Sequence, residues 1–119
     1  MANTLQTLPN PIGRATRFLV ATVDTATSIK HVDNAATDLK MLKAEVSAGS
    51  DFLLLWNKAD PVVGTTAPHW QFPTETDLCI VFDEPVAFSE GLSLGVTNVG
   101  GTASSGAPSN ANTVSMIVE

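Results

Sequence analysis

The chain has 119 residues, the length of one domain, and is 44% hydrophobic but only 15% charged, against about 25% in an average domain. All six Lys and Arg residues precede residue 59, and the rest of the chain carries seven acids, so its net charge disfavours binding to nucleic-acid phosphates. No apolar run approaches the length of about 18 residues that spans a membrane, and the N-terminal residues predict no signal peptide. The single cysteine excludes an intrachain disulfide and fits a protein made in a reducing cytoplasm.

Residues 1–16 are predicted to form an extended N-terminal arm. Pro9 and Pro11 exclude a helix or a central strand there. Three apolar side chains are spaced along this polar segment, and we expect them to contact a neighbouring molecule: Leu5, Leu8 and Ile12.

Residues 17–119 are predicted to form one all-β domain, an antiparallel β-sandwich. Short runs rich in Thr, Val, Leu, Ile and Phe alternate with Gly, Pro, Asn and Asp, which is typical of a sandwich or barrel. The expected strands are Arg17–Val23, Ser28–Val32, Asp38–Val46, Asp51–Asn57, His69–Phe72, Asp77–Phe82, Gly91–Thr97 and Thr113–Glu119. Residues 34–46 also fit a helical spacing, which leaves a helix as the alternative there.

The strand 51–57 is apolar on both faces. Leu53 and Leu55 share one face, and Phe52, Leu54 and Trp56 share the other. A two-layer sandwich buries one face of each strand, so the second face must meet a loop, the arm or another subunit. We assign Phe52, Leu54 and Trp56 to an oligomer interface.

No catalytic, cofactor or metal site is predicted. The histidine candidates are His31 with Asp33, and His69 with Trp70 and Asp60, but neither forms part of a hydrolase signature. The low-complexity loop 98–112 contains no ionisable group.

Cys79, between Leu78 and Ile80, is expected to be a small buried residue. The acids Asp77, Asp83, Glu84 and Glu90 lack a calcium-loop spacing and are expected in turns.

Trp56 and Trp70 provide the one ligand hypothesis. Either ring, with His69 and polar loops, would suit a carbohydrate-binding module, because sugars stack on aromatic rings. Packing in a core or an interface is the more ordinary role for a large ring.

Two stretches of the chain resemble a family of small tailed-phage virion proteins. They are LLLWNKADPVVGTTAPHWQFP at residues 53–73 and VAFSEGLSLGVTN at residues 86–98. The resemblance starts at Thr27 and includes the final Ser/Ala/Gly/Asn-rich loop that leads into a terminal strand. The matching residues are Trp56, Asn57, Lys58, Ala59, Val63, Gly64, Thr65, Phe88, Gly91 and Leu92.

The resemblance implies a jelly-roll-like sandwich, often trimeric, without catalytic residues. It implies a capsid decoration or cement protein made in the host cytoplasm and displayed on the exterior of the virion. Its partners would be its own copies, as a homotrimer, and the major capsid protein, but neither nucleic acid nor a membrane. Leu5, Leu8 and Ile12 of the arm would then contact the capsid or a neighbouring subunit. The alternatives are another virion component (neck, tail or head fibre) and a carbohydrate-binding module.

Overall fold

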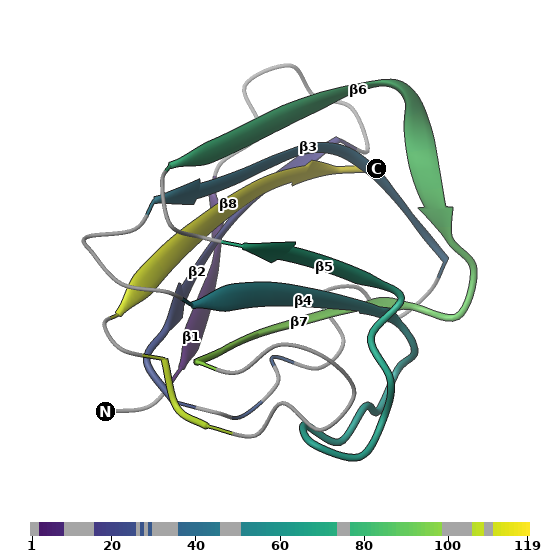
Figure 1. Ribbon diagram of the computed structural model, residues 1–119. Helices are drawn as coiled ribbons and strands as arrows, with labels where there is room; N and C mark the ends of the chain where they lie inside the picture. The colour runs from purple at the N-terminus through teal and green to yellow at the C-terminus, as the bar shows by residue number, and fades with distance from the viewer. Residues whose placement is uncertain are drawn as a thin grey trace.

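The structure is a computed structural model that describes residues 3–8, 16–25, 27, 29, 36–45, 51–73, 77–98, 106–108 and 111–119. These residues form two antiparallel sheets that pack face to face (Figure 1). The five-stranded sheet has the order β1 (Thr4–Leu8), β2 (Arg17–Val23), β8 (Asn112–Val118), β3 (Thr37–Glu45) and β6 (Leu78–Phe88). The three-stranded sheet has the order β5 (Trp70–Pro73), β4 (Phe52–Asn57) and β7 (Leu92–Thr97). The predicted β-sandwich is confirmed.

Alternating side chains of both sheets fill the space between them. In β2 and β8 every second residue is buried, as the sequence alternation predicts for strands with one solvated face. The core comprises Leu19, Ala21, Val23, Leu39, Leu42, Ala44, Leu53, Leu55, Phe88, Leu92, Leu94, Val96, Val114, Met116 and Val118.

The strand pairings are nested along the chain. β2 pairs with β8, β3 pairs with β6, and β4 pairs with β5. Ile29 lies in the predicted strand 28–32 and forms a bridge to Leu94 of β7, with backbone hydrogen bonds of 2.7 and 3.1 Å. The segment around Ile29 therefore meets the edge of the small sheet.

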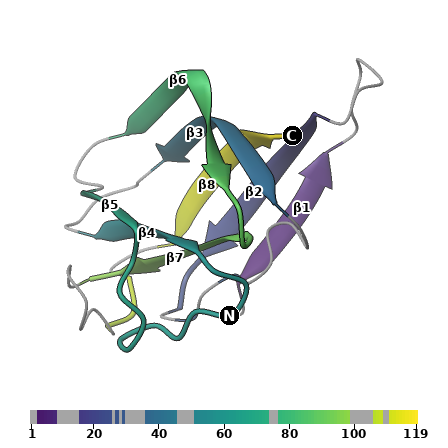
Figure 2. The ribbon, with the colours of Figure 1, turned by 90° about the vertical axis from the view of Figure 1, so that its right-hand side faces the viewer.

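Part of the predicted arm belongs to the larger sheet. Thr4–Leu8 form β1, which pairs with β2 along its whole length at the sheet edge (Figure 2). The Asn3 side chain accepts hydrogen bonds from the backbone N–H groups of Asp24 (2.8 Å) and Thr25 (3.1 Å), and donates one to the carbonyl of Thr27 (2.7 Å). The start of β1 is thus attached to the end of β2.

Two expectations about β6 were wrong. The strand does not end at Phe82 but curves on to Phe88, and Asp83 and Glu84 lie within it rather than in a turn. Cys79 is exposed, because inward-facing residues alternate with it. An edge strand packs one face on the core and leaves the other in water, so an apolar sequence context did not bury Cys79.

Residues 37–45 form strand β3, so the helical alternative for this segment is excluded. A bulge between Leu39 and Met41 places Lys40 beside the ladder and explains the mixed periodicity of the sequence. In the described part of the chain, no helix is long and apolar enough to cross a membrane.

Candidate binding site

The segment 58–68 between β4 and β5, here called the apical loop, is held in shape by its own hydrogen bonds. The carbonyl of Val62 accepts from the backbone N–H groups of Thr65 (3.1 Å) and Thr66 (2.8 Å). The Thr66 hydroxyl accepts from the Val62 N–H (3.0 Å). Gly64 has a φ of 87°, a conformation that favours glycine. Val62 is 52% exposed, so the loop presents an apolar side chain to solvent.

Trp56 fixes this loop to the small sheet. Its indole Nε1 donates a 3.0 Å hydrogen bond to the carbonyl of Thr66, and the side chain is fully buried. Leu54 is also fully buried, and Phe52 is half-buried. The prediction that Leu54 and Trp56 lie on an uncovered face, available to another subunit, was therefore wrong. The chain covers them itself, and its own apical loop covers the indole.

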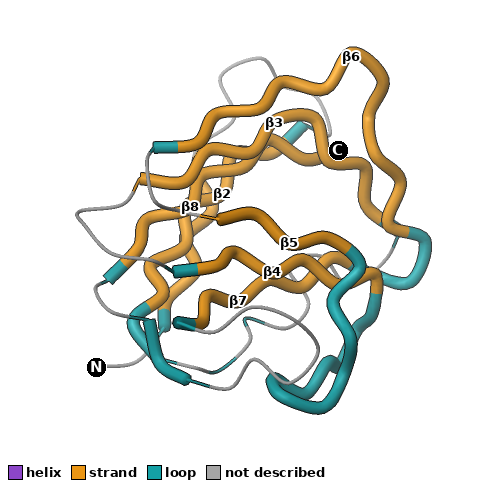
Figure 3. Tube along the Cα trace, in the orientation of Figure 1, coloured by secondary structure: helices purple, strands orange, loops and turns teal. Residues whose placement is uncertain are grey.

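Asn57 links the apical loop to the turn 89–91 between β6 and β7. Its side-chain oxygen accepts from the Glu90 N–H (2.8 Å), and its amide nitrogen donates to the Ser89 hydroxyl (3.3 Å). The Ser93 hydroxyl donates to the carbonyl of Lys58 (2.8 Å), which adds a second link. The loop and the turn therefore form one surface at this end of the sandwich (Figures 1 and 3), here called the apical surface.

His69 closes the base of the apical loop. The backbone N–H of His69 donates to the carbonyl of Leu55 (2.9 Å), and the ring Nδ1 accepts from the backbone N–H of Asn57 (3.1 Å). This contact gives His69 a structural role. Beside it lies a cleft of about 750 Å³, which is lined by Asn57, Lys58, Ala59, Asp60, Thr66, Ala67, His69 and Glu90.

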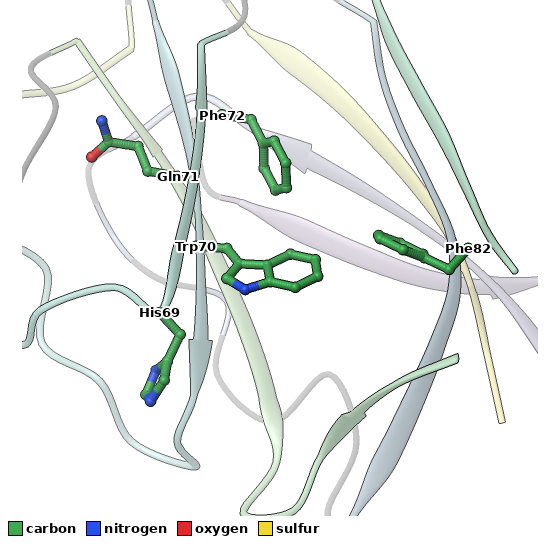
Figure 4. Close-up of a pocket in the computed structure, with 5 residues that line it drawn as sticks. All are labelled: His69, Trp70, Gln71, Phe72 and Phe82. Carbon is green, nitrogen blue, oxygen red and sulfur yellow. The ribbon is translucent and has the colours of Figure 1, made fainter. Parts of the chain in front are cut away.

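A second cleft, of about 400 Å³, opens between the edge strands β5 and β6 and is lined by His69, Trp70, Gln71, Phe72 and Phe82. Trp70 and Phe72 point towards Phe82, whereas Gln71 points to the opposite side of β5 (Figure 4). Trp70 also packs on Phe88, and its ring centroid lies 5.8 Å from Phe72, 5.6 Å from Phe82 and 6.3 Å from Phe88. These aromatic side chains close the flank of the sandwich.

This packing bears on the carbohydrate hypothesis. Trp56 has no exposed surface on which a sugar could stack. Trp70 is half-buried, and three phenylalanine rings surround it. A sugar platform needs a flat ring face open to solvent, so the observed geometry favours packing as the role of both rings.

The other residues that the sequence analysis singled out do not come together in one site. Leu5 packs against the core, whereas Leu8 is 41% exposed. Ile12, His31 and Asp33 lie outside the described residues. Among the residues that are described, no group of three or more His, Cys, Asp and Glu side chains is placed to hold a metal ion.

Sequence reasoning missed Asn57 as the link between loop and turn, and Phe82 and Phe88 as partners of Trp70. Asn57 ends a strand at the start of a turn-rich segment, which is a weak signal for a side chain that bonds to backbone groups. Its partners are more than 30 residues away in the sequence, at Ser89 and Glu90. Only the fold brings them together.

Comparison with known proteins places the chain in no family. No family model matches it, and neither a curated protein nor a solved structure shows significant similarity to it.

Proposed function

We propose that the chain is a non-enzymatic structural protein of a tailed-phage virion, of the capsid decoration or cement type, which binds the major capsid protein on the exterior of the shell. The basis is the resemblance of residues 53–73 and 86–98 to small virion proteins. The geometry of the apical surface adds a physical reason for that resemblance.

The observation that carries the proposal is the meeting of these two stretches at one end of the molecule. Trp56 and Phe88 belong to the buried interior, so the sandwich itself requires them. Asn57, Lys58 and Gly64 lie outside the core, and a sandwich does not need them. They build a loop of fixed shape, bonded to the turn 89–91, as a preformed protein-binding surface would require.

We also infer that the sandwich is a jelly roll. A jelly roll forms when one long antiparallel hairpin rolls up, so its first strand pairs with its last and the pairings are nested. The observed pairs β2–β8, β3–β6 and β4–β5 follow this rule. The remaining pair of a jelly roll would be formed by the segment around Ile29 and by β7, and the bridge between Ile29 and Leu94 lies at this place. In this reading, β1 is an added edge strand.

The homotrimer expected from the resemblance stays a prediction. Two of the three residues assigned to its interface, Leu54 and Trp56, are buried inside one chain and give it no support.

The test is quantitative mass spectrometry of purified particles from cells that carry the gene, combined with antibody labelling of intact particles. A cement protein should be present in a copy number comparable to that of the major capsid protein and should be labelled on the shell. A few copies per particle would indicate a neck, tail or fibre component, and absence from the particle would contradict the proposal.

A binding assay tests the apical surface. Particles that lack this protein are mixed with the purified chain or with the double variant Lys58→Glu/Val62→Asp. We expect the affinity of the variant to be at least about 10-fold lower, because one change reverses the charge of an exposed side chain and the other replaces an exposed apolar side chain with a carboxylate. The control is Thr7→Ala on β1, an exposed position outside the apical surface, which should bind as the unmodified chain does.

A further inference from the structure

The outer face of the five-stranded sheet carries a continuous apolar stripe. In the strand register, Leu8 lies opposite Phe18, Phe18 opposite Ile117, Ile117 opposite Met41, and Met41 opposite Val81. This row, here called the outer stripe, crosses all five strands and is about 19 Å long at the usual strand spacing. It is therefore one surface feature made by five separate segments of the chain.

The outer stripe is not part of the core. None of its residues belongs to the core or packs against it, because the small sheet covers the opposite face (Figure 2). Val81 is 75% exposed and Leu8 is 41% exposed, and the three residues between them are half-buried by their neighbours. Among the described residues, these two and Val62 are the exposed large apolar side chains, so the ends of the stripe account for two of the three. A contiguous apolar patch of this kind marks an interaction surface.

The centre of this face carries no net charge. Lys40 forms an ion pair with Glu119, and Lys43 forms one with Glu45 at 2.8 Å. The hydrogen bond from Lys43 to Glu45 and the charge of Glu45 raise the pKa of Lys43, which keeps its charge at neutral pH. A partner therefore needs no countercharge at the centre of the stripe; it needs a second apolar, neutral surface.

The same face of a second copy of the chain is such a surface. It carries the same five apolar side chains, and the same ion pairs neutralise its centre.

We propose that the outer stripe is the contact between two copies of the chain, related by a twofold axis that passes through Ile117 parallel to β8. Because β8 is the middle strand, this axis reverses the stripe. Phe18 then lies over Met41 of the other copy, a favourable pairing of an aromatic ring with sulfur, and Leu8 lies over Val81. The proposal does not depend on the virion function, and a twofold pair differs in mass from the trimer expected from the resemblance.

The available area fits a weak but specific dimer. Five strands at the usual spacing and three outward rows span about 24 by 20 Å, so two copies bury about 1,000 Å². This value lies at the lower limit for specific interfaces, and we expect association at micromolar concentrations.

Sedimentation velocity of the full chain and of Ile117→Lys tests the contact. Residue 117 points outward, so the substitution should leave a folded monomer, checked by circular dichroism, and weaken association about 100-fold, since each dimer buries two unpaired charges. Val62→Lys, on the apical loop, replaces an exposed apolar residue outside the stripe and should leave the dimer intact. A wild-type chain that stays monomeric up to about 100 µM overturns the proposal. A trimer also overturns it. So does a monomeric wild-type chain that binds particles while Ile117→Lys does not, and this result would show that the outer stripe binds the capsid shell.

Crosslinking tests the orientation. The row next to the outer stripe runs across the five strands from Gln6 through Val20, Ser115 and Lys43 to Cys79. Its two ends, Gln6 and the exposed Cys79, lie about 19 Å apart within one chain. The reversed arrangement brings Gln6 of one copy over Cys79 of the other. A bifunctional maleimide shorter than the distance within one chain should therefore link Gln6→Cys into a covalent dimer, but neither wild type nor Gln6→Cys/Cys79→Ser. Equal crosslinking of the wild type, through Cys79 alone, would overturn the reversed orientation.

Discussion

At the scale of single residues, the contacts of Trp56 and Asn57 determine the surface that the molecule presents. Trp56 bonds through its indole to the carbonyl of Thr66, and Asn57 bonds through its amide to the turn 89–91. Both residues stand at the end of β4, so one strand terminus positions two connections that are distant in sequence. The apical surface is a product of these bonds.

Trp56→Phe should lower the free energy of unfolding by about 1–3 kcal/mol, because the carbonyl of Thr66 loses its donor and the smaller ring leaves space. Urea unfolding followed by circular dichroism measures the change. Val62→Ala in the same loop, at a half-exposed position, should stay within about 0.5 kcal/mol of the unmodified chain. Equal stability of Trp56→Phe and wild type would show that the indole bond does not fix the loop.

At the scale of elements, the edge strands differ in how firmly they are held. β6 is tied to β5 by the aromatic cluster around Trp70, across the gap between the sheets. β1 has one neighbour, β2, and packs on the core through Leu5. Removing β1 therefore exposes the edge of β2 but leaves the rest of the core in place.

Deletion of residues 1–8 should give a folded chain whose free energy of unfolding is lower by about 1–3 kcal/mol, from the loss of Leu5 packing and of the Asn3 bonds. Light scattering should also rise, since the uncovered edge can pair with other chains. Asn3→Ala should produce a smaller loss of stability without the aggregation. If the truncated chain unfolds at the same urea concentration as the full chain, β1 contributes nothing to the domain.

At the scale of the whole molecule, the C-terminal strand completes the larger sheet. β8 lies between β2 and β3, with Val114, Met116 and Val118 in the core, so segments from both ends of the chain must meet before the sheet is complete. Such non-local pairing makes folding strongly cooperative and slow compared with helical domains.

A chain that lacks residues 111–119 should not fold on its own, and a peptide of those residues should restore the sheet when added, as strand addition does elsewhere. Circular dichroism and peptide binding measure the rescue. A peptide with Ile117→Lys should still rescue, since that side chain faces outward, whereas one with Met116→Lys should fail, because it would bury a charge. Folding of the truncated chain alone would contradict the central role of β8.

The class of fold and most strand positions follow from the amino-acid sequence alone. The two-residue alternation of β2 and β8 follows from local chemistry, because one face of each strand meets the core and the other meets water. The same alternation separated Leu53 and Leu55 of β4, which lie in the core, from Phe52, Leu54 and Trp56 on the other face. What covers the outward faces depends on residues far away in the chain, and no local pattern encodes it.

Which apolar residues are covered depends on how the folded strands and loops lie against one another. Trp56 and Val81 both point away from the core of the sandwich, yet the apical loop buries one while the other is 75% exposed at a sheet edge. Likewise, Leu8, Phe18, Met41, Val81 and Ile117 form a stripe only because five strands align in one register. Register is a property of pairs of strands, so a surface built from it becomes visible only when the sheet has formed.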